Sequence, residues 1–481
     1  PSGRAHRARR RAAATNYRAI LGSSAADTVV LTAAVIGHNY DLGTDADTLQ
    51  LADGTNTVTL TGIESVLGGT GVDTLTLGTA ISGATMDLGA GIDKITLANG
   101  TNSLTLANVE TVIGQGGDDA ITLTTAISGG SIALGAGANQ LTLADFNNSL
   151  SIDANIDTLV GGTANDAIVL TAFVTGNTYD LGSGTDTLTL LATGTGANTV
   201  TLSNIESLVG GSGIDTVTLS TAVTAGKFNL GAGADVLTLA DGTNSLTVAG
   251  VESIQGGTGD DDITLGAGVT SGTFTLGSGT DTLRLANAAN TLNIGADIDT
   301  LIGNSGADTI TLGATVTGRT YDLGAGSDRL NLANGTNSVT AANIETVTGN
   351  SGADTVTLTA ATSGGSFILG DGTDILQLAN FNNVVSLGST IETVLGGTAN
   401  DLVSLTATVT GGIYDLGSGT DTLTLLATGS GTNSISLSNA ESLMGGSGAD
   451  TVSLVTLTTQ GTFNLGAGTD VLTLGNSGNN T

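Results

Sequence analysis

Short stretches of this chain alternate between apolar and polar residues, and each stretch follows an aspartate. In 73–77, DTLTL, and in 93–97, DKITL, an aliphatic residue stands two positions after the aspartate and Leu stands four positions after it. The residues between them are polar, as with Thr74 and Lys94. Because side chains alternate between the two faces of a strand, this pattern predicts short strands with one buried and one wet face.

The alternating stretch belongs to a repeat of 46 to 49 residues that fills the chain. Each repeat carries the motif twice, and the second aspartate lies 20 residues after the first; in one repeat Asn139 takes the second place. A third acid, such as Glu64, always lies 9 residues before the next first aspartate. All variation in length therefore falls between the second aspartate and the third acid. The repeats begin at Gly22, Gly68, Gly114, Gly161, Gly210, Gly256, Gly303, Gly349, Gly396 and Gly445.

Such regular leucines predict an all-β fold, a parallel β-solenoid of the β-roll or β-helix type, because identical positions of stacked coils form continuous ladders. We expect two coils per repeat, of about 20 and about 26 residues, and about twenty coils in a single solenoid over 22–481. Glycine suits the tight corners of each coil on steric grounds. With only 1 Pro in the chain, nearly every residue can donate its N–H to the next coil.

The charge is strongly acidic and unevenly placed. The formal net charge is −32, and only five of the 11 basic residues lie beyond residue 20, against all 43 acidic residues. Such a body attracts cations and has no affinity of its own for nucleic acid or anionic lipid. The chain has no Cys, so disulfides play no part, and no apolar run is long enough to span a membrane.

Residues 1–21 differ from the rest because they are basic. Two interpretations are open for this segment: a disordered end foreign to the solenoid, or an arm that docks on an acidic neighbour or an anionic cell-envelope polymer. Its arginines are Arg4, Arg7, Arg9, Arg10, Arg11 and Arg18.

The stretches GGTGVD, GGSGID, GGTGDD and GGSGAD resemble the hemolysin-type (RTX) calcium-binding repeats. The resemblance covers nearly all of 22–481. It implies Ca²⁺ held between the glycine turns of successive coils by aspartate carboxylates and main-chain carbonyls, and export to the cell surface or beyond. The chain departs from the family pattern because its motifs are not in nine-residue tandem and the second motif begins with Leu, as in LGAGID.

The residue chemistry also favours calcium, which takes six to eight oxygen ligands. Stacked carboxylates repel one another unless cations lie between them. Alternatively, the aspartates hydrogen-bond their own turns, and Asn139 suits both interpretations. We expect the third acids to be solvated or bonded to turns. The expected calcium ligands are Asp27, Asp47, Asp73, Asp93, Asp119, Asp166, Asp186, Asp215, Asp235, Asp261, Asp281, Asp308, Asp328, Asp354, Asp374, Asp401, Asp421, Asp450 and Asp470.

These features predict a structural protein and not an enzyme. His6 and His38 are the only histidines, and no nucleophile or acid–base pair stands apart from the repeat. We expect a secreted or surface protein, as an S-layer subunit, matrix filament or adhesin stalk. Its copies are expected to join end to end or laterally, because open solenoid ends expose strand edges.

Two other functions stay open. One is a calcium-binding secretion module of a larger exported enzyme or toxin. The other is an ice-binding solenoid, suggested by outward pairs such as Thr74 with Thr76, although Lys94 and Gln140 interrupt the same column.

Overall fold

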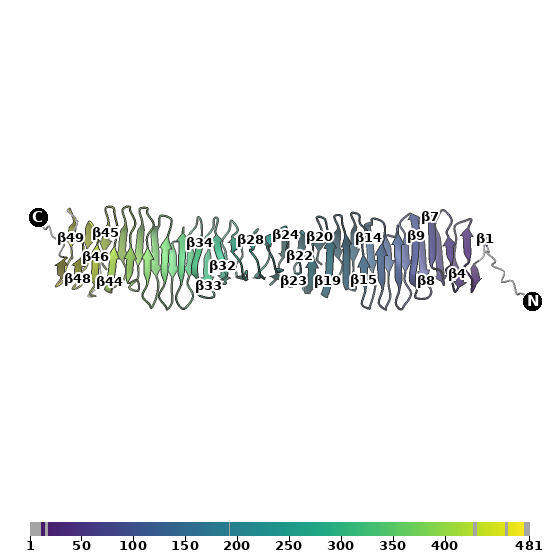
Figure 1. Ribbon diagram of the computed structural model, residues 1–481, viewed down its shortest axis with the longest axis horizontal. Helices are drawn as coiled ribbons and strands as arrows, with labels where there is room; N and C mark the ends of the chain where they lie inside the picture. Colours follow the sequence, from purple (N-terminus) through teal and green to yellow (C-terminus); the bar gives the residue numbers. More distant parts are fainter. Residues whose placement is uncertain (1–10, 15–17, 192, 427–430, 457–459, 476–481) are drawn as a thin grey trace, which may run out of the picture. The chain divides into compact units, whose positions relative to one another are not determined.

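The computed structural model describes residues 11–14, 18–191, 193–426, 431–456 and 460–475. The chain divides into two compact units, Pro1–Ala240 and Asp241–Thr481. Unit 1 contains strands β1 (Arg11–Ala14) to β25 (Val236–Thr238), and unit 2 contains β26 (Ser245–Ala249) to β50 (Val471–Leu474) (Figure 1). The described residues form no helix, and thus none that is long and apolar enough to cross a bilayer. The all-β prediction is confirmed.

Each unit is a parallel β-solenoid built from two sheets. A strand pairs in parallel with the strand two places further along, so odd-numbered strands form one sheet and even-numbered strands the other. In unit 1, β8 (Asp73–Leu77) pairs with β10 (Lys94–Thr96). In unit 2, β28 (Asp262–Leu265) pairs with β30 (Asp281–Arg284) in the same way. One strand from each sheet makes one coil, which confirms the predicted fold (Figure 1).

The division of repeats into coils differs from the prediction. The repeat from Gly68 forms five strands, because β9 (Ser82–Ala90), β11 (Ser103–Ala107) and β12 (Thr111–Ile113) join β8 and β10. Five strands are two and a half coils, so the expected two coils per repeat are wrong. Paired residues lie 17 to 24 positions apart. A coil of 26 residues is therefore absent from the described pairings.

The physical reason is that the third acid occupies the same corner of the coil as the two aspartates. Lys94 pairs with both Thr74 and Thr111, which follow the first aspartate and the third acid of that repeat. Because a repeat ends half a coil out of phase, successive repeats begin on alternate sheets. The repeat of Asp73 begins with β8 on the even sheet, and the next begins with β13 (Ala120–Leu123) on the odd sheet.

The predicted leucine ladder is the core of each unit. Leu75 and Leu77 on β8 are 0 % and 4 % exposed. The Leu four positions after an aspartate position is buried to the same degree in every described case except Leu474, which is 50 % exposed. The outward residues between these apolar positions, such as Thr74 and Thr76, remain partly accessible. The period-two pattern therefore placed the core correctly.

The glycine that opens each repeat is needed because coils approach closely at that corner. A Cβ on Gly68 would lie 2.0 Å from the carbonyl oxygen of Leu88 in the next coil. The other nine opening glycines are equally close to the matching Leu, at 2.0 to 2.2 Å. These positions have no positive φ, so steric contact between coils selects glycine there.

The basic N-terminal segment is described only in part. β1 pairs with β3 (Thr28–Leu31), and β2 (Ala19–Ser23) pairs with β4 (Ile36–Gly43). Residues 1–10, which include four of the arginines of the expected docking arm, lie outside the described residues. The docking arm therefore stays a prediction.

Candidate functional site

Polar side chains from successive coils line up along one corner of the solenoid, and we call each such set of an asparagine, two aspartates and a third acid a polar ladder. In the ladder formed by Asn56, Asp73, Asp93 and Glu110, each residue begins or directly precedes an even-numbered strand. The main-chain N–H of Asn56 donates to Oδ1 of Asp73 at 3.1 Å. The N–H of Asp73 donates to Oδ1 of Asp93, and the N–H of Asp93 to Oε2 of Glu110, both at 2.7 Å. Each carboxylate thus holds the coil before it.

The same bonds recur along the chain. The first aspartate donates its N–H to Oδ1 of the second-aspartate position in all ten repeats, at 2.6 to 2.9 Å. The second position donates to the third acid at 2.7 to 2.9 Å in eight repeats. The third acid is therefore a hydrogen-bond acceptor for the neighbouring coil, in line with the expectation of turn bonding.

The asparagine of the ladder was missed in the sequence. Its Nδ2 donates to Oδ1 of the first aspartate at 2.8 to 2.9 Å in nine repeats. The available signal was its fixed place, 17 or 18 residues before the next first aspartate. The residues are Asn56, Asn102, Asn148, Asn198, Asn244, Asn290, Asn337, Asn383 and Asn433.

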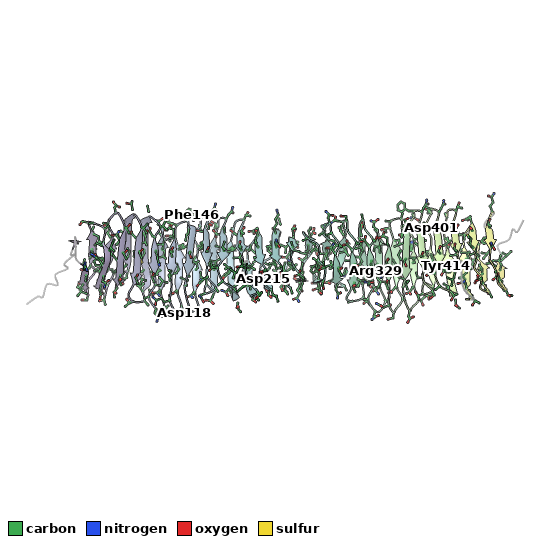
Figure 2. All side chains as sticks on the ribbon, turned by 180° about the vertical axis from the view of Figure 1, so that it is seen from behind. Asp118, Phe146, Asp215, Arg329, Asp401 and Tyr414 are labelled. Atoms are coloured by element: carbon green, nitrogen blue, oxygen red, sulfur yellow. The ribbon has the colours of Figure 1, made fainter. Side chains whose placement is uncertain are left out.

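The expected calcium ligands point into the coil corner and not into solvent. Seventeen of the nineteen aspartates are at most 2 % exposed, and only Asp27 and Asp470 are more accessible. Asp118, directly before the buried Asp119, is exposed instead and lies at an edge of unit 1 (Figure 2). A buried carboxylate loses its hydration and must be compensated inside the protein.

Burial raises the pKa of seven second aspartates, and the charges of neighbouring acids add to the rise. The pKa of Asp93 is raised to about 6 by burial and by the charges of Asp73 and Glu110, while the N–H of Asp73 opposes the rise. Burial likewise raises the pKa to about 6 for Asp186, Asp328, Asp374 and Asp421. Burial also raises the pKa of Asp47, Asp73, Asp119, Asp166, Asp261, Asp281, Asp308, Asp354 and Asp401.

One oxygen of these buried carboxylates is left without a hydrogen bond of normal geometry. This holds for Oδ2 of sixteen aspartates in the described part of the chain. A buried polar atom without a partner is unfavourable, so a proton or a cation is expected beside it. The sixteen are Asp47, Asp73, Asp93, Asp119, Asp166, Asp186, Asp215, Asp261, Asp281, Asp308, Asp328, Asp354, Asp374, Asp401, Asp421 and Asp450.

Asn139 shows what surrounds this second oxygen. Its Oδ1 accepts the N–H of Asp119 at 2.9 Å, as the second aspartates do in other repeats. Its Nδ2 donates to the carbonyl oxygens of Gly135 at 2.9 Å and Asn155 at 2.8 Å, with a longer contact of 3.4 Å to that of Gly137. The amide side of this residue thus faces carbonyl oxygens only.

One third acid has a cation of its own. Arg319 forms an ion pair with Asp299, and its Nε donates to the carbonyl oxygen of Ala296 at 3.0 Å. The corresponding position of other repeats is often glycine, as at Gly365 and Gly412, where a Cβ would contact the neighbouring aromatic ring. The arginine therefore neutralises a ladder carboxylate in this repeat.

The side chains available as ligands limit the kind of metal site that the polar ladder can form. Among the described residues, no three His, Cys, Asp or Glu side chains converge in a way that suits a metal ion. An ion at the ladder would therefore rest on at most two carboxylates, together with main-chain carbonyl oxygens. All-oxygen sets of this kind suit a hard cation such as Ca²⁺ or Mg²⁺. Calcium binding by the nineteen aspartates stays a prediction.

Comparison with known proteins assigns no family to the chain. No family model matches it, and no curated protein matches it. The resemblance to hemolysin-type repeats therefore depends on the glycine and aspartate motifs and on the parallel β-solenoid to which they fold.

Proposed function

We propose that this chain is a secreted or surface-exposed structural protein whose β-solenoid is stabilised by calcium and assembles into a surface layer, filament or adhesin stalk. The observation that carries the proposal is the buried, unpartnered Oδ2 that recurs from repeat to repeat. A cation beside this oxygen would remove the penalty of burying the carboxylate charge. One device repeated in this way serves the stability of a scaffold, whereas a catalytic site needs one special constellation.

The carboxylates of the polar ladder and the carbonyl oxygens of the glycine turns would hold the ion. The ion would link main chain and side chains at the corner where coils meet, so binding would add directly to the free energy of unfolding. Extracellular modules bind calcium with dissociation constants of about 10⁻⁴ to 10⁻³ M, and sites with few charged ligands are expected to bind in this weak range.

Charge supports a role for the cation in assembly as well. Copies with a net charge of −32 repel one another, and bound divalent ions reduce that charge. The sheet faces also offer apolar contacts. Val384 and Leu402 are direct neighbours on β41 (Val384–Leu387) and β43 (Leu402–Leu405) and are 40 % and 39 % exposed.

The test combines thermal melting with size measurement. Circular dichroism, light scattering after size exclusion and negative-stain imaging would be performed with calcium, with magnesium and with chelator. We expect calcium alone to raise the melting temperature and to produce regular assemblies. A protein that stays monomeric at high concentration with calcium contradicts the assembly, and unchanged melting contradicts the stabilisation.

A second candidate, ice binding, is favoured by one column of hydroxyl groups on the odd sheet. Thr85, Thr105, Thr122 and Thr142 are paired neighbours on four successive strands. Thr48 and Ser65 continue this column in the direction of the N-terminus. Thermal hysteresis of the purified protein would test this function, and its absence at millimolar concentration would exclude it.

A further inference from the structure

The two aspartates of a repeat differ in what faces them. Oδ1 of the first aspartate accepts two donors, as Asp119 does from the N–H of Asn102 at 3.0 Å and from its Nδ2 at 2.8 Å. The other oxygen lies on the side of turn N–H groups: Ser23 donates its N–H to Oδ2 of Asp27 at 2.9 Å. At Asp73, where burial raises the pKa, the N–H of Gly69 is among the groups that oppose the rise. Oδ1 of the first aspartates therefore accepts two donors, and in Asp27 and Asp73 a turn N–H group also faces the carboxylate, although Oδ2 of Asp73 makes no hydrogen bond of normal geometry.

Second aspartates sit between one donor and several acceptors. The turn before Asn139 reads LGAGAN and the turn before Asp93 reads LGAGID, so four of six residues are identical. The first glycine of each turn has a similar φ, +77° and +84°. Both side chains accept the N–H of the first aspartate through Oδ1, at 2.9 and 2.7 Å.

This equivalence fixes the surroundings of Oδ2. The second glycine has a left-handed φ before Asn139 (Gly137, +143°) and before Asp186 (Gly184, +151°) but not before Asp93 (Gly91), so the turns of Asn139 and Asp93 are similar and not identical. A planar side chain with a similar backbone and the same Oδ1 contact places Oδ2 of Asp93 on the side where Asn139 places Nδ2. This places the carbonyl oxygen of Gly89, whose φ matches that of Gly135, on the same side, as the carbonyl oxygen of Gly135 is for Asn139. A carboxylate oxygen against carbonyl oxygens is repulsive unless a positive group lies between them.

We propose that Asn139 takes the place of a bound cation, and that the cation sites of this chain are the turns of the second aspartates alone. The inference rests on the proposed calcium stabilisation and specifies its location. In the repeat from Gly114, the amide of Asn139 supplies the positive hydrogens that an ion supplies elsewhere, so this repeat needs no ion. The sites belong to Asp47, Asp93, Asp186, Asp281, Asp328, Asp374 and Asp421.

Three substitutions test the assignment, with bound calcium counted by equilibrium dialysis and melting followed in chelator at pH 7.5. Asp93→Asn copies the Asn139 turn, so we expect one calcium ion fewer per chain and a higher melting temperature in chelator. Asn139→Asp is the reverse exchange. We expect it to bind one ion more per chain, and to melt lower in chelator with recovery on addition of calcium.

Asp73→Asn is the matched control from the other class of aspartate. Its new amide would point at N–H groups, so we expect a lower melting temperature and an unchanged number of bound ions. The assignment is overturned if Asp93→Asn and Asn139→Asp leave the ion count of a calcium-binding chain unchanged, or if Asp93→Asn melts lower in chelator. Ion counts that shift as expected while calcium drives no assembly would uphold the sites and contradict the proposed function.

Discussion

Asp73 donates its main-chain N–H to Oδ1 of Asp93, a residue 20 positions further along the chain and one coil away. The acceptor is a side chain, but the bond acts like a main-chain hydrogen bond of the sheet, because it connects the start of β8 to the corner of the next coil. It also places the carboxylate of Asp93 in a buried corner, where its charge is unfavourable. Stability and charge are thereby coupled at this point.

This coupling predicts an unusual dependence of stability on pH in the absence of calcium. Burial raises the pKa of Asp93 in the folded state to about 6, whereas an unfolded aspartate has a pKa of about 3.9. The folded chain therefore binds more protons than the unfolded chain between these values, and the free energy of unfolding should rise as the pH falls from 7 to 4.5. Chemical denaturation in chelator across this range measures it.

Calcium should suppress this pH dependence, because an ion bound to the carboxylate competes with the proton. With excess calcium, we expect the free energy of unfolding to change little between pH 7 and 5, so that the stabilisation added by calcium shrinks as the pH falls through about 6. A chain that becomes steadily less stable on acidification in chelator would show that the ladder carboxylates are satisfied as anions.

Removal of the ladder asparagine should destabilise the corner. Asn102 is fully buried, and its Nδ2 donates to Oδ1 of Asp119 and to the carbonyl oxygens of Ala98 and Gly100. Asn102→Ala leaves these acceptors unpaired, so we expect a loss of about 3 kcal/mol in the free energy of unfolding. Asn99→Ala, at an exposed position of the same turn, should change it by less than about 0.5 kcal/mol. Equal effects of the two substitutions would contradict the role given to Asn102.

A methyl group at the opening glycine should separate two coils. Gly68→Ala would place Cβ 2.0 Å from the carbonyl oxygen of Leu88, and main chain must move to relieve the contact. We expect a loss of about 3 kcal/mol, at the upper end of what overpacking causes. Gly83→Ala is the control: Gly83 has a φ of +74° and open space around it, so only backbone strain of about 1 kcal/mol is expected. Denaturant melts of both variants give the comparison.

The core leucines should act locally. Leu75 is fully buried on β8, and Leu75→Ala should lower the stability by about 3 kcal/mol through the cavity it leaves. Because each coil contacts only its neighbours, hydrogen exchange should accelerate in the adjoining coils and remain slow far along the unit. Thr76→Ala, outward on the same strand, should leave exchange nearly unchanged. Uniform acceleration throughout the chain would show that a unit unfolds as a whole.

The sequence was sufficient for the strands and the core because the period of two and the constant leucines report burial directly. Leu77 and Leu97 lie where the pattern placed them, and Thr74 pairs with Lys94 at the expected separation of 20 residues. The number of coils per repeat was wrong because Glu110 occupies the corner that the aspartates mark in other coils. The longer side chain of Glu110 accepts the same type of hydrogen bond as the aspartates do, so a glutamate and an aspartate play the same structural role at this corner.

The environment of the carboxylates could not be read from spacing. Glycine and aspartate motifs predict a turn, but they do not reveal whether the side chain faces solvent, N–H groups or carbonyl oxygens. Asn139 was visible as the single exception among the second aspartates, although its meaning depends on the carbonyl oxygens of Gly135 and Asn155 around it. Asn102 gives a weaker signal in the sequence than the acids do, because asparagines are common in this chain and only its spacing to Asp119 distinguishes it.

Because each repeat leaves half a coil over, an odd or even number of repeats decides on which of the two sheets the following strands lie. Within a unit, gain or loss of one repeat would transfer every later outward side chain to the opposite sheet, whereas gain or loss of two would restore the original side. A partner that binds the outer face of one sheet therefore contacts equivalent side chains only at every other repeat. Natural variants of this chain that keep such a partner should differ in length by even numbers of repeats.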